Sequence, residues 1–259
     1  MLLKVLILIA AVLSMAAFAF GQVKKPELPA VKVPIEKSLQ AVVVTTADWN
    51  AVQGKARLLE RKNEMAKWKA VSDEFPVVVG RKGLAPGYDG DDHAYLTPYA
   101  PPMPKVEGDG RSPSGFFPLT TSFGNADVGS KLPFTKLEEF TECVDDVNSR
   151  WYNKIVNRMQ VGIFDWKSSE KMIEVVPQYD LGVFVAYNSY PAIRGNGSCI
   201  FLHIWKDANT GTAGCTAMER QNLERIVKWL DPAKNPYLIQ MTESQYDSSR
   251  KSYKLPKLK

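Results

Sequence analysis

Residues 199–218 read CIFLHIWKDANTGTAGCTAM, and this stretch carries the strongest signal in the chain. Its first part is an apolar run that contains His203. A short apolar run bounded by polar segments is typical of a buried β-strand. A polar loop follows, and Thr212-Ala213-Gly214-Cys215 then opens a stretch that we interpret as the start of a helix. The stretch therefore predicts a strand, a loop and a helix, with a histidine and a cysteine close together.

His203 and Cys215 together predict cysteine-dependent acyl transfer. A thiol nucleophile needs a base that ionises it and donors that hold the oxyanion. A cysteine beside the first turn of a helix feels the positive end of the helix dipole, which favours the thiolate. Each residue alone has a simpler interpretation, since core histidines are common and free cysteine is among the most buried residue types. The pairing favours the catalytic interpretation.

The composition is that of a soluble globular protein. The chain has 259 residues, of which 45% are hydrophobic and 24% charged, with a net charge of +5. This modest excess favours an anionic partner only weakly and does not indicate nucleic acid. The acidic stretch around His93 is interpreted as a solvated loop, and no metal site is expected.

The two ends of the chain differ from its middle. Residues 1–21 contain Lys4, an apolar run and the small-residue signal Ala17-Phe18-Ala19, which is the layout of a secretory signal peptide. An uncleaved membrane anchor is the alternative. Residues 22–34 are rich in proline and charge and predict a linker. Residues 246–259 are interpreted as a solvated basic tail, which leaves one domain over residues 35–245.

This domain is expected to be mostly β with a few helices (α+β). Met218, Leu223, Ile226, Val227 and Leu230 recur at helical spacing and predict one clear helix, which ends at Asp231-Pro232. Loops rich in glycine and proline are expected over residues 80–90 and 99–105. Strands are predicted from apolar or alternating runs over residues 39–46, 56–61, 64–71, 75–79, 116–123, 181–187, 199–205 and 237–241.

Three stretches in order resemble the L,D-transpeptidase catalytic domain (the YkuD-like family) of bacterial cell-wall enzymes. Residues 105–119, KVEGDGRSPSGFFPL, are similar to the family's Thr-Pro-x-Gly hairpin. Residues 197–205, GSCIFLHIW, are similar to the strand with the catalytic histidine. Residues 212–215, TAGC, are similar to the signature around the nucleophile. The segments CVDD at 143–146, YN at 152–153 and YN at 187–188 resemble a periplasmic branch.

The resemblance implies a β-sandwich or barrel and an enzyme that acts on peptidoglycan stem peptides. Cys215 would be the nucleophile, forming a thioester, and His203 the general base and acid. The backbone N–H groups of Gly214 and Cys215 would hold the oxyanion. No cofactor, metal or partner protein is implied. The residues expected to line the substrate site are Thr212, Ala213, Trp205, Ser112 and Gly115.

The sequence departs from the family pattern beside the nucleophile. Ala213 stands where most members have a second histidine, and Ala217 stands where many have arginine or asparagine. The interval between His203 and Cys215 is also shorter than in better-known members. The pair is retained, so the thioester step is expected to survive while the choice of acceptor differs.

Three alternatives remain open at this point. The protein could be an L,D-carboxypeptidase that hydrolyses the same bonds, a non-catalytic wall-binding module, or a secreted thiol peptidase unrelated to the wall. In an exported protein with three cysteines, one thiol stays unpaired. We therefore expect a disulfide between Cys143 and Cys199 and a free Cys215, in the periplasm or cell envelope.

Overall fold

A computed structural model describes residue 32 and residues 34–87 and 103–258. The predicted signal peptide, nearly all of the linker and the stretch around His93 lie outside these residues. Of the helices within them, neither α1 nor α2 has the length and apolar character to traverse a bilayer. The strands are β1 (Gln40–Thr46), β2 (Gln53–Glu60), β3 (Lys69–Ala70), β4 (Phe75–Val78), β5 (Leu84–Pro86), β6 (Ser112–Gly124), β7 (Phe134–Lys136), β8 (Thr141–Cys143), β9 (Ile155–Asn157), β10 (Glu170–Lys171), β11 (Leu181–Val185), β12 (Phe201–Ile204), β13 (Thr216–Met218) and β14 (Tyr237–Thr242). The helical segments are α1 (Arg220–Trp229) and α2 (Glu243–Ser249), with 3-10 turns η1 (Ile35–Lys37), η3 (Arg158–Gln160), η4 (Met172–Glu174) and η5 (Pro232–Lys234).

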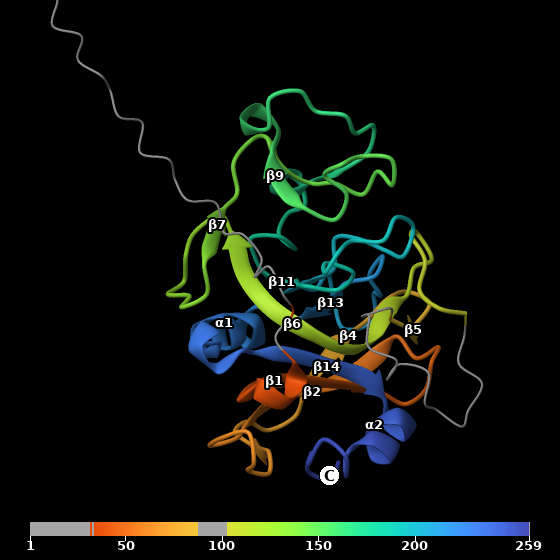
Figure 1. Ribbon diagram of the computed structural model, residues 1–259, viewed down its shortest axis with the longest axis vertical. Coiled ribbons are helices and arrows are strands. Elements are labelled where there is room, and N and C mark those ends of the chain that lie inside the picture. The colour runs from red at the N-terminus through yellow and green to blue at the C-terminus, as the bar shows by residue number, and fades with distance from the viewer. Residues whose placement is uncertain (1–31, 33, 88–102, 259) are drawn as a thin grey trace, which may run out of the picture.

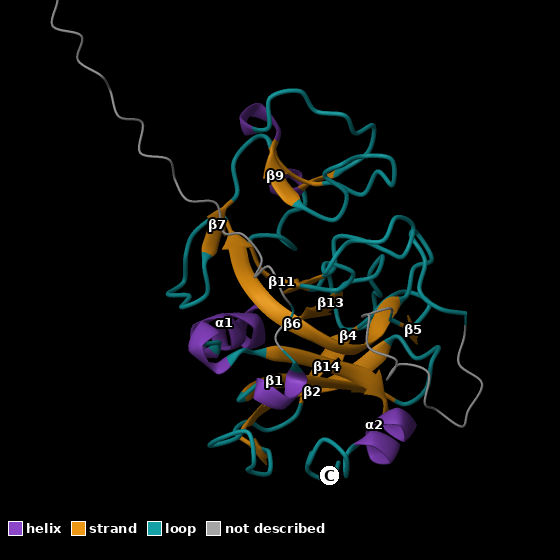
Figure 2. Cartoon of the chain, viewed as in Figure 1, coloured by secondary structure: helices purple, strands orange, loops and turns teal. Residues whose placement is uncertain are grey.

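The main sheet closes on itself. Its strands follow the order β1-β14-β6-β11-β12-β13-β4-β2, and β2 also pairs with β1, so the path forms a ring. The β1–β14 and β12–β13 pairs are parallel, and the remaining pairs of the ring are antiparallel. Closure leaves few free edges, which favours a barrel. The mostly-β fold expected from the sequence is confirmed (Figure 2).

Alternation along β12 places His203 on the outer side of the barrel. Leu202 and Ile204 belong to the large apolar core, which they share with Leu223, Ile226 and Val227 of helix α1. Phe201 belongs to a different apolar cluster, together with Cys199 and Cys215. Successive strand residues point to opposite faces, so His203 lies on the face of Phe201. Strand β12 is thus buried on both faces, and His203 is the polar residue on its outer face.

A small second sheet stands apart from the barrel. Strands β10, β8 and β9 pair in that order, all antiparallel. The sheet lies at the top of Figure 1, above the barrel. We did not predict these strands, because runs of two or three residues show no detectable alternation.

The structure differs from the prediction in three places: after Cys215, over residues 64–71 and over residues 80–90. The stretch after Cys215 is strand β13, not a helix, because Thr216–Met218 pairs with both β12 and β4. Helix α1 begins only at Arg220. The predicted strand over residues 64–71 is reduced to Lys69–Ala70, and a turn, a bend and irregular chain make up the rest. The loop predicted over residues 80–90 contains the short strand β5.

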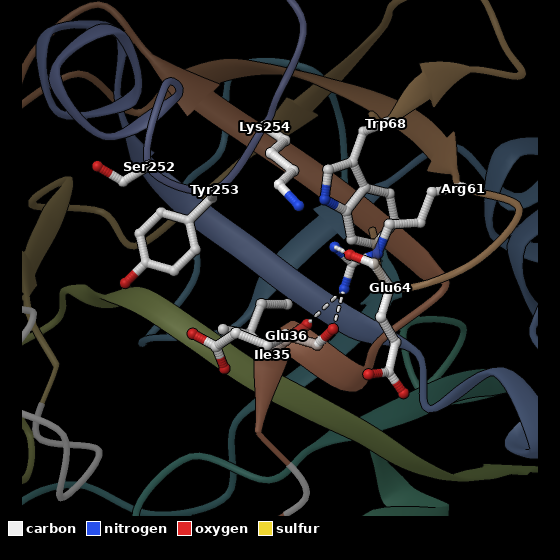
Figure 3. A pocket seen from close by; sticks show the side chains of 8 residues that line it. All are labelled: Ile35, Glu36, Arg61, Glu64, Trp68, Ser252, Tyr253 and Lys254. Carbon is white, nitrogen blue, oxygen red and sulfur yellow. Dashed lines mark hydrogen bonds between the residues drawn. The ribbon is translucent and has the colours of Figure 1, made fainter. Parts of the chain in front are cut away.

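The C-terminal residues pack onto the barrel, so our boundary at residue 246 was wrong. Helix α2 crosses it, and both Tyr246 and Leu255 are buried in a cluster with strands β1 and β14. A capping box between Thr242 and Gln245 fixes the start of α2. The tail also lines a small hollow (Figure 3), whose lining residues are Ile35, Glu36, Arg61, Glu64, Trp68, Ser252, Tyr253 and Lys254. The side chains of Tyr246 and Leu255 account for the packing of this otherwise basic tail on the barrel.

Candidate active site

Cys215 lies directly before strand β13, and hydrogen bonds to its carbonyl hold its backbone in place. That carbonyl accepts hydrogen bonds from the Thr212 hydroxyl at 2.6 Å and the Ser112 hydroxyl at 2.8 Å. The Gly214 amide donates to Thr212 Oγ1 at 3.1 Å. Thr212 and Ser112, expected to bind substrate, therefore fix the backbone around the cysteine. The Gly214 N–H, expected to hold an oxyanion, is engaged within this turn.

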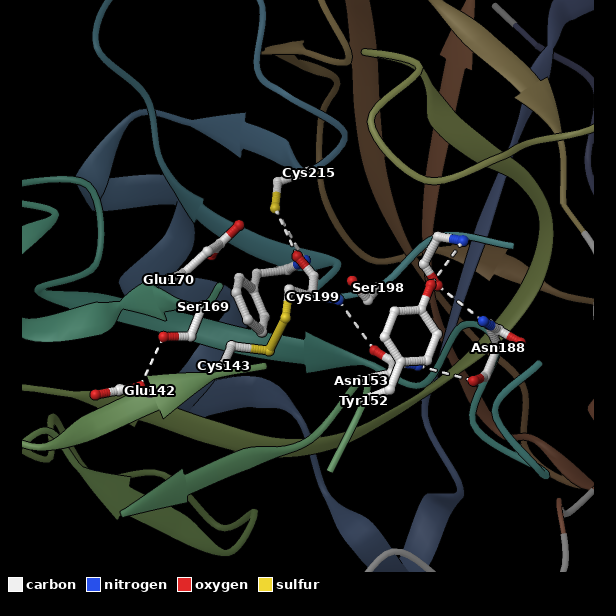
Figure 4. The surroundings of a disulfide bond; sticks show 12 residues. Glu142, Cys143, Tyr152, Asn153, Ser169, Glu170, Asn188, Ser198, Cys199 and Cys215 are labelled. Carbon is white, nitrogen blue, oxygen red and sulfur yellow. Dashed lines mark hydrogen bonds between the residues drawn. A yellow bond between two sulfur atoms is a disulfide. The ribbon is translucent and has the colours of Figure 1, made fainter. Parts of the chain in front are cut away.

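The thiol of Cys215 is buried, with 5% of the residue exposed. Its sulfur accepts from the Phe201 amide at 3.3 Å and donates to the Cys199 carbonyl at 3.4 Å, as Figure 4 shows for Cys199. Burial raises the pKa of the Cys215 thiol well above its ordinary value, and the charge of Glu170 adds to that rise. The helix-dipole argument does not apply here, because a strand and not a helix follows the cysteine.

His203 is held in one tautomer by its neighbour. Its Nδ1 lies 2.7 Å from the Ile204 carbonyl oxygen, and a carbonyl can only accept, so Nδ1 carries the proton. Nε2 is then the nitrogen with a free lone pair. Burial lowers the pKa of His203 to about 4. At neutral pH the ring is therefore uncharged and able to accept a proton.

Both members of the pair lie beside strand β12, yet within the described residues no hydrogen bond joins their side chains. Tyr179 contacts both of them. Its ring meets the His203 ring edge-on, with 5.3 Å between centroids. Its hydroxyl donates to Glu170 Oε2 at 2.6 Å and lowers the pKa of the Cys215 thiol. Sequence reasoning missed Tyr179, because only the packing of β11 against β12 brings it here.

A disulfide joins Cys143 of strand β8 to Cys199, two residues before β12. It is the expected pairing, and Cys215 is the one free cysteine of the three. Cys199 has a φ of 54° and accepts the thiol hydrogen bond through its carbonyl. The disulfide thus ties the small sheet to a backbone atom that contacts the nucleophile.

Lys105 places a buried positive charge beside the nucleophile loop. Its ammonium forms an ion pair with Asp109 at 2.8 Å, and its side chain is 3% exposed. A Cβ built on Gly214 would lie 3.7 Å from Nζ. The charge of Lys105 lowers the pKa of the Cys215 thiol. Its sequence signal is a lysine ahead of the Gly-Asp-Gly turn, in the stretch that resembles the family's hairpin.

Other expected substrate residues have different positions. Ala213 is exposed beside Cys215. Trp205 is half-buried, and its amide donates to the Met218 carbonyl at the end of β12. Gly115 lies on strand β6 opposite Gln240, where a Cβ would approach the Phe117 ring to 2.8 Å. Close packing in the barrel therefore explains the glycine.

Comparison with known families agrees with this arrangement. The model of the L,D-transpeptidase catalytic domain (YkuD) matches residues 54–239, which is well over half of the chain. This protein belongs to the L,D-transpeptidase catalytic-domain family. The match runs from β2 to β14 and includes His203, Cys215 and the small sheet. A search of curated proteins finds no match.

Membership in the L,D-transpeptidase family indicates the type of enzyme. Enzymes of this family act on peptidoglycan stem peptides. Ala217, where the resemblance implies a cationic or amide side chain in many members, is fully buried on β13 and lies in register with His203. A small side chain at this position leaves the imidazole without an additional polar neighbour from β13.

Proposed function

We propose that this protein is an exported L,D-transpeptidase that forms a thioester on Cys215 with His203 as the general base. The observation that carries the proposal is the free thiol of Cys215, which lies on the same face of strand β12 as the neutral imidazole of His203, within a domain of this family. A stem peptide that enters would bring its carbonyl to Cys215 and replace the hydrogen bond from the thiol to the Cys199 carbonyl.

The reaction divides into two halves. His203 Nε2 takes the thiol proton, and the sulfur attacks the carbonyl between the third and fourth stem residues. The tetrahedral intermediate then loses the terminal D-amino acid, which leaves with a proton from His203. An amine or water later cleaves the thioester. The Phe201 amide and the Lys105 ammonium stabilise the thiolate, because each favours the charged form of sulfur.

Thiolate formation in the free enzyme is unfavourable, since burial raises the thiol pKa far above neutral. Burial also disfavours the charged form of the His203 imidazole, whose pKa is about 4. We therefore expect the proton to move as the substrate carbonyl arrives, so that no fully charged pair stands alone in the buried site. This expectation agrees with a nucleophile that is protected until a stem binds.

Hydrolysis of the thioester is the second candidate outcome. Ala213 is exposed beside the nucleophile and presents no polar side chain to an incoming amine. A polar contact to a bound substrate is worth about 1–3 kcal/mol, so its lack weakens selection of an amine over water. Exchange of the terminal D-amino acid and cleavage of a wall-attached protein are further outcomes of the same thioester.

Product analysis on disaccharide-tetrapeptides, with and without an added amine acceptor, tests the proposal. Release of the terminal residue by the parent protein and not by Cys215→Ala is the expected result. A 3–3 dimer consists of two stems joined through their third residues. Efficient formation of this dimer as the sole product would show that the side chains absent at positions 213 and 217 are dispensable. Turnover by Cys215→Ala at the parental rate would refute the role of the thiol. A protein without hyper-reactive thiol and without turnover would be a binding module.

Export is the remaining part of the proposal. The signal-like residues 1–21 support it, and so does the disulfide, because disulfides persist mainly in oxidising compartments. Fractionation of cells that express the full chain should recover the protein, with Cys143 and Cys199 oxidised, from the envelope or periplasm. Recovery of a reduced protein from the cytoplasm would contradict export.

A further inference from the structure

Tyr179 is fixed in place by aromatic rings on several sides. It is 6% exposed and packs edge-on against Phe123, Phe201 and His203, with centroid distances of 5.7, 5.4 and 5.3 Å. Such contacts leave the ring little freedom to turn away. The hydroxyl therefore has a fixed direction, and it points to Glu170.

The hydroxyl of Tyr179 donates to Glu170 Oε2 at 2.6 Å. Glu170 belongs to strand β10 of the small sheet and lies in register with Cys143, so the disulfide and the strand pairing together fix its position. Figure 4 shows its side chain directed toward Cys215. A carboxyl group of the small sheet thus reaches the nucleophile of the barrel through one tyrosine.

Tyr179 and Glu170 have opposite effects on the thiolate. The tyrosine hydroxyl favours the charged sulfur, whereas an ionised Glu170 opposes it. Among the described residues, the ionisable groups that interact with Glu170 are Tyr179, Cys215, Asp145 and Glu107, and none of these four is cationic. Burial and these acidic neighbours raise the pKa of Glu170 to about 7. A substantial fraction of the molecules therefore holds Glu170 as a neutral carboxyl at neutral pH.

A neutral Glu170 changes the direction of the hydrogen bond. Its O–H then donates to Tyr179 Oη, and the tyrosine hydrogen becomes available to the sulfur. We propose that Tyr179 is a positioning residue that donates its hydroxyl hydrogen to the Cys215 thiolate, held in place by the neutral carboxyl of Glu170. No covalent bond changes in Tyr179 or Glu170, and the thiol proton still passes to the base. The inference rests on the proposed role of Cys215.

Alkylation of Cys215 by iodoacetamide, followed across pH, tests this inference without any stem peptide. Under non-reducing conditions the disulfide protects Cys143 and Cys199, so Cys215 is the thiol that reacts. Tyr179→Phe keeps the ring and removes the hydroxyl. Its alkylation at pH 7 should be roughly tenfold slower or more, with the pH midpoint shifted upward, because a hydrogen bond to a charged group is lost. A purely structural role for Tyr179 would leave that midpoint unchanged.

Glu170→Gln separates a neutral donor from a proton acceptor. The glutamine amide donates to Tyr179 Oη and carries no charge that opposes the thiolate. Above pH 7, where the parental carboxyl ionises, this variant should react at least about threefold faster than the parent, since removal of a like charge lowers the thiol pKa. A rate as low as that of Tyr179→Phe would overturn the proposal, because it would make the carboxylate the acceptor of the thiol proton.

Tyr190→Phe is the matched control. Its hydroxyl is buried and has no hydrogen-bond partner among the described residues, so its removal should leave the alkylation profile unchanged. Equal profiles for Tyr179→Phe and Tyr190→Phe would contradict the inference. If Tyr179→Phe does not fold, the rate of Glu170→Gln above pH 7 decides alone. Failure of stem turnover with the predicted alkylation pattern would refute the proposed function and leave this inference intact.

Discussion

Strand β1 of the barrel buries all seven of its residues, whereas β9 and β10 of the small sheet bury one residue between them. The barrel is stabilised by apolar contacts around a closed ring of strands. The small sheet has only a small apolar cluster of its own, and polar contacts gather around Glu142. Glu142 accepts from Trp166 Nε1 at 2.7 Å and Ser169 Oγ at 2.6 Å and pairs with Arg158 at 3.3 Å.

The two regions also divide the site between them. The barrel carries Cys215 and His203, while the small sheet supplies Glu170 and one end of the disulfide. A sheet of short strands with few buried apolar residues opens locally at low free-energy cost. We therefore expect the barrel to set whether the reaction occurs and the small sheet to set how readily the thiolate forms.

Removal of the disulfide should give the largest effect. The double variant Cys143→Ala/Cys199→Ala frees a loop with a sequence separation of 56 residues, which corresponds to about 4 kcal/mol of lost stability in the chain-entropy model. Urea unfolding measures the loss. If the small sheet alone depends on the disulfide, barrel signals will persist while proteolysis within residues 138–180 increases. An unchanged midpoint and protease pattern would contradict the comparison.

His203 should make the protein sensitive to acid. Its pKa is about 4 in the fold and about 6.5 when unfolded, so the unfolded chain binds its proton first as pH falls. The free energy of unfolding should thus decrease between pH 6.5 and 4, by about 3 kcal/mol from this group. Glu170, with its raised pKa, acts in the opposite direction between about 4.5 and 7.

Comparison of the parent with His203→Gln isolates that contribution. The variant should lose less stability on acidification, and the two curves should converge toward low pH. Parallel curves over this range would show that the imidazole is not buried as a neutral group, which would also weaken its assignment as base.

Replacement of His203 by alanine should lower the rate of stem turnover at least about a hundredfold, the usual size of a lost general base and about 2.7 kcal/mol in activation free energy. The comparison with Cys215→Ala matters, because that variant should show no turnover at all. Initial rates at saturating tetrapeptide measure both. A rate for His203→Ala within a few-fold of the parent would assign the base elsewhere.

Glu142→Gln should give the smallest effect, a loss of about 2 kcal/mol confined to the small sheet, because charged hydrogen bonds to Trp166 and Ser169 are weakened. Hydrogen exchange resolves it by region: amides of β8 and β9 should exchange faster and those of β1 and β14 should not. Equal acceleration in both sheets would mean that they unfold as one unit.

How much the sequence predicts follows the same division. The apolar runs of β1, β12 and β14 identified barrel strands, because burial on both faces leaves a continuous hydrophobic signal. The strands of the small sheet have no such signal. The helix expected after Cys215 failed because the apolar residue Met218 pairs in β13 and does not continue the stripe of α1.

The sequence predicted only those site residues whose residue type itself indicates chemistry. His203, Cys215 and the disulfide cysteines stand out because those residue types are rare in the chain. Tyr179 and Glu170 are ordinary residues whose importance depends on the contact between two sheets. Lys105 likewise gains its significance from burial beside Gly214, which no local pattern reveals.

Mass spectrometry of the intact protein during reaction with a disaccharide-tetrapeptide tests the central claim most directly. We predict a covalent adduct on the peptide that contains Cys215. The mass of the protein should increase by the mass of the substrate minus the mass of the released D-amino acid. The adduct should be absent from Cys215→Ala and should decay faster when an accepted amine is added. Release of the terminal residue with no adduct, even after rapid acid quenching, or an adduct that persists in Cys215→Ala, would contradict the account.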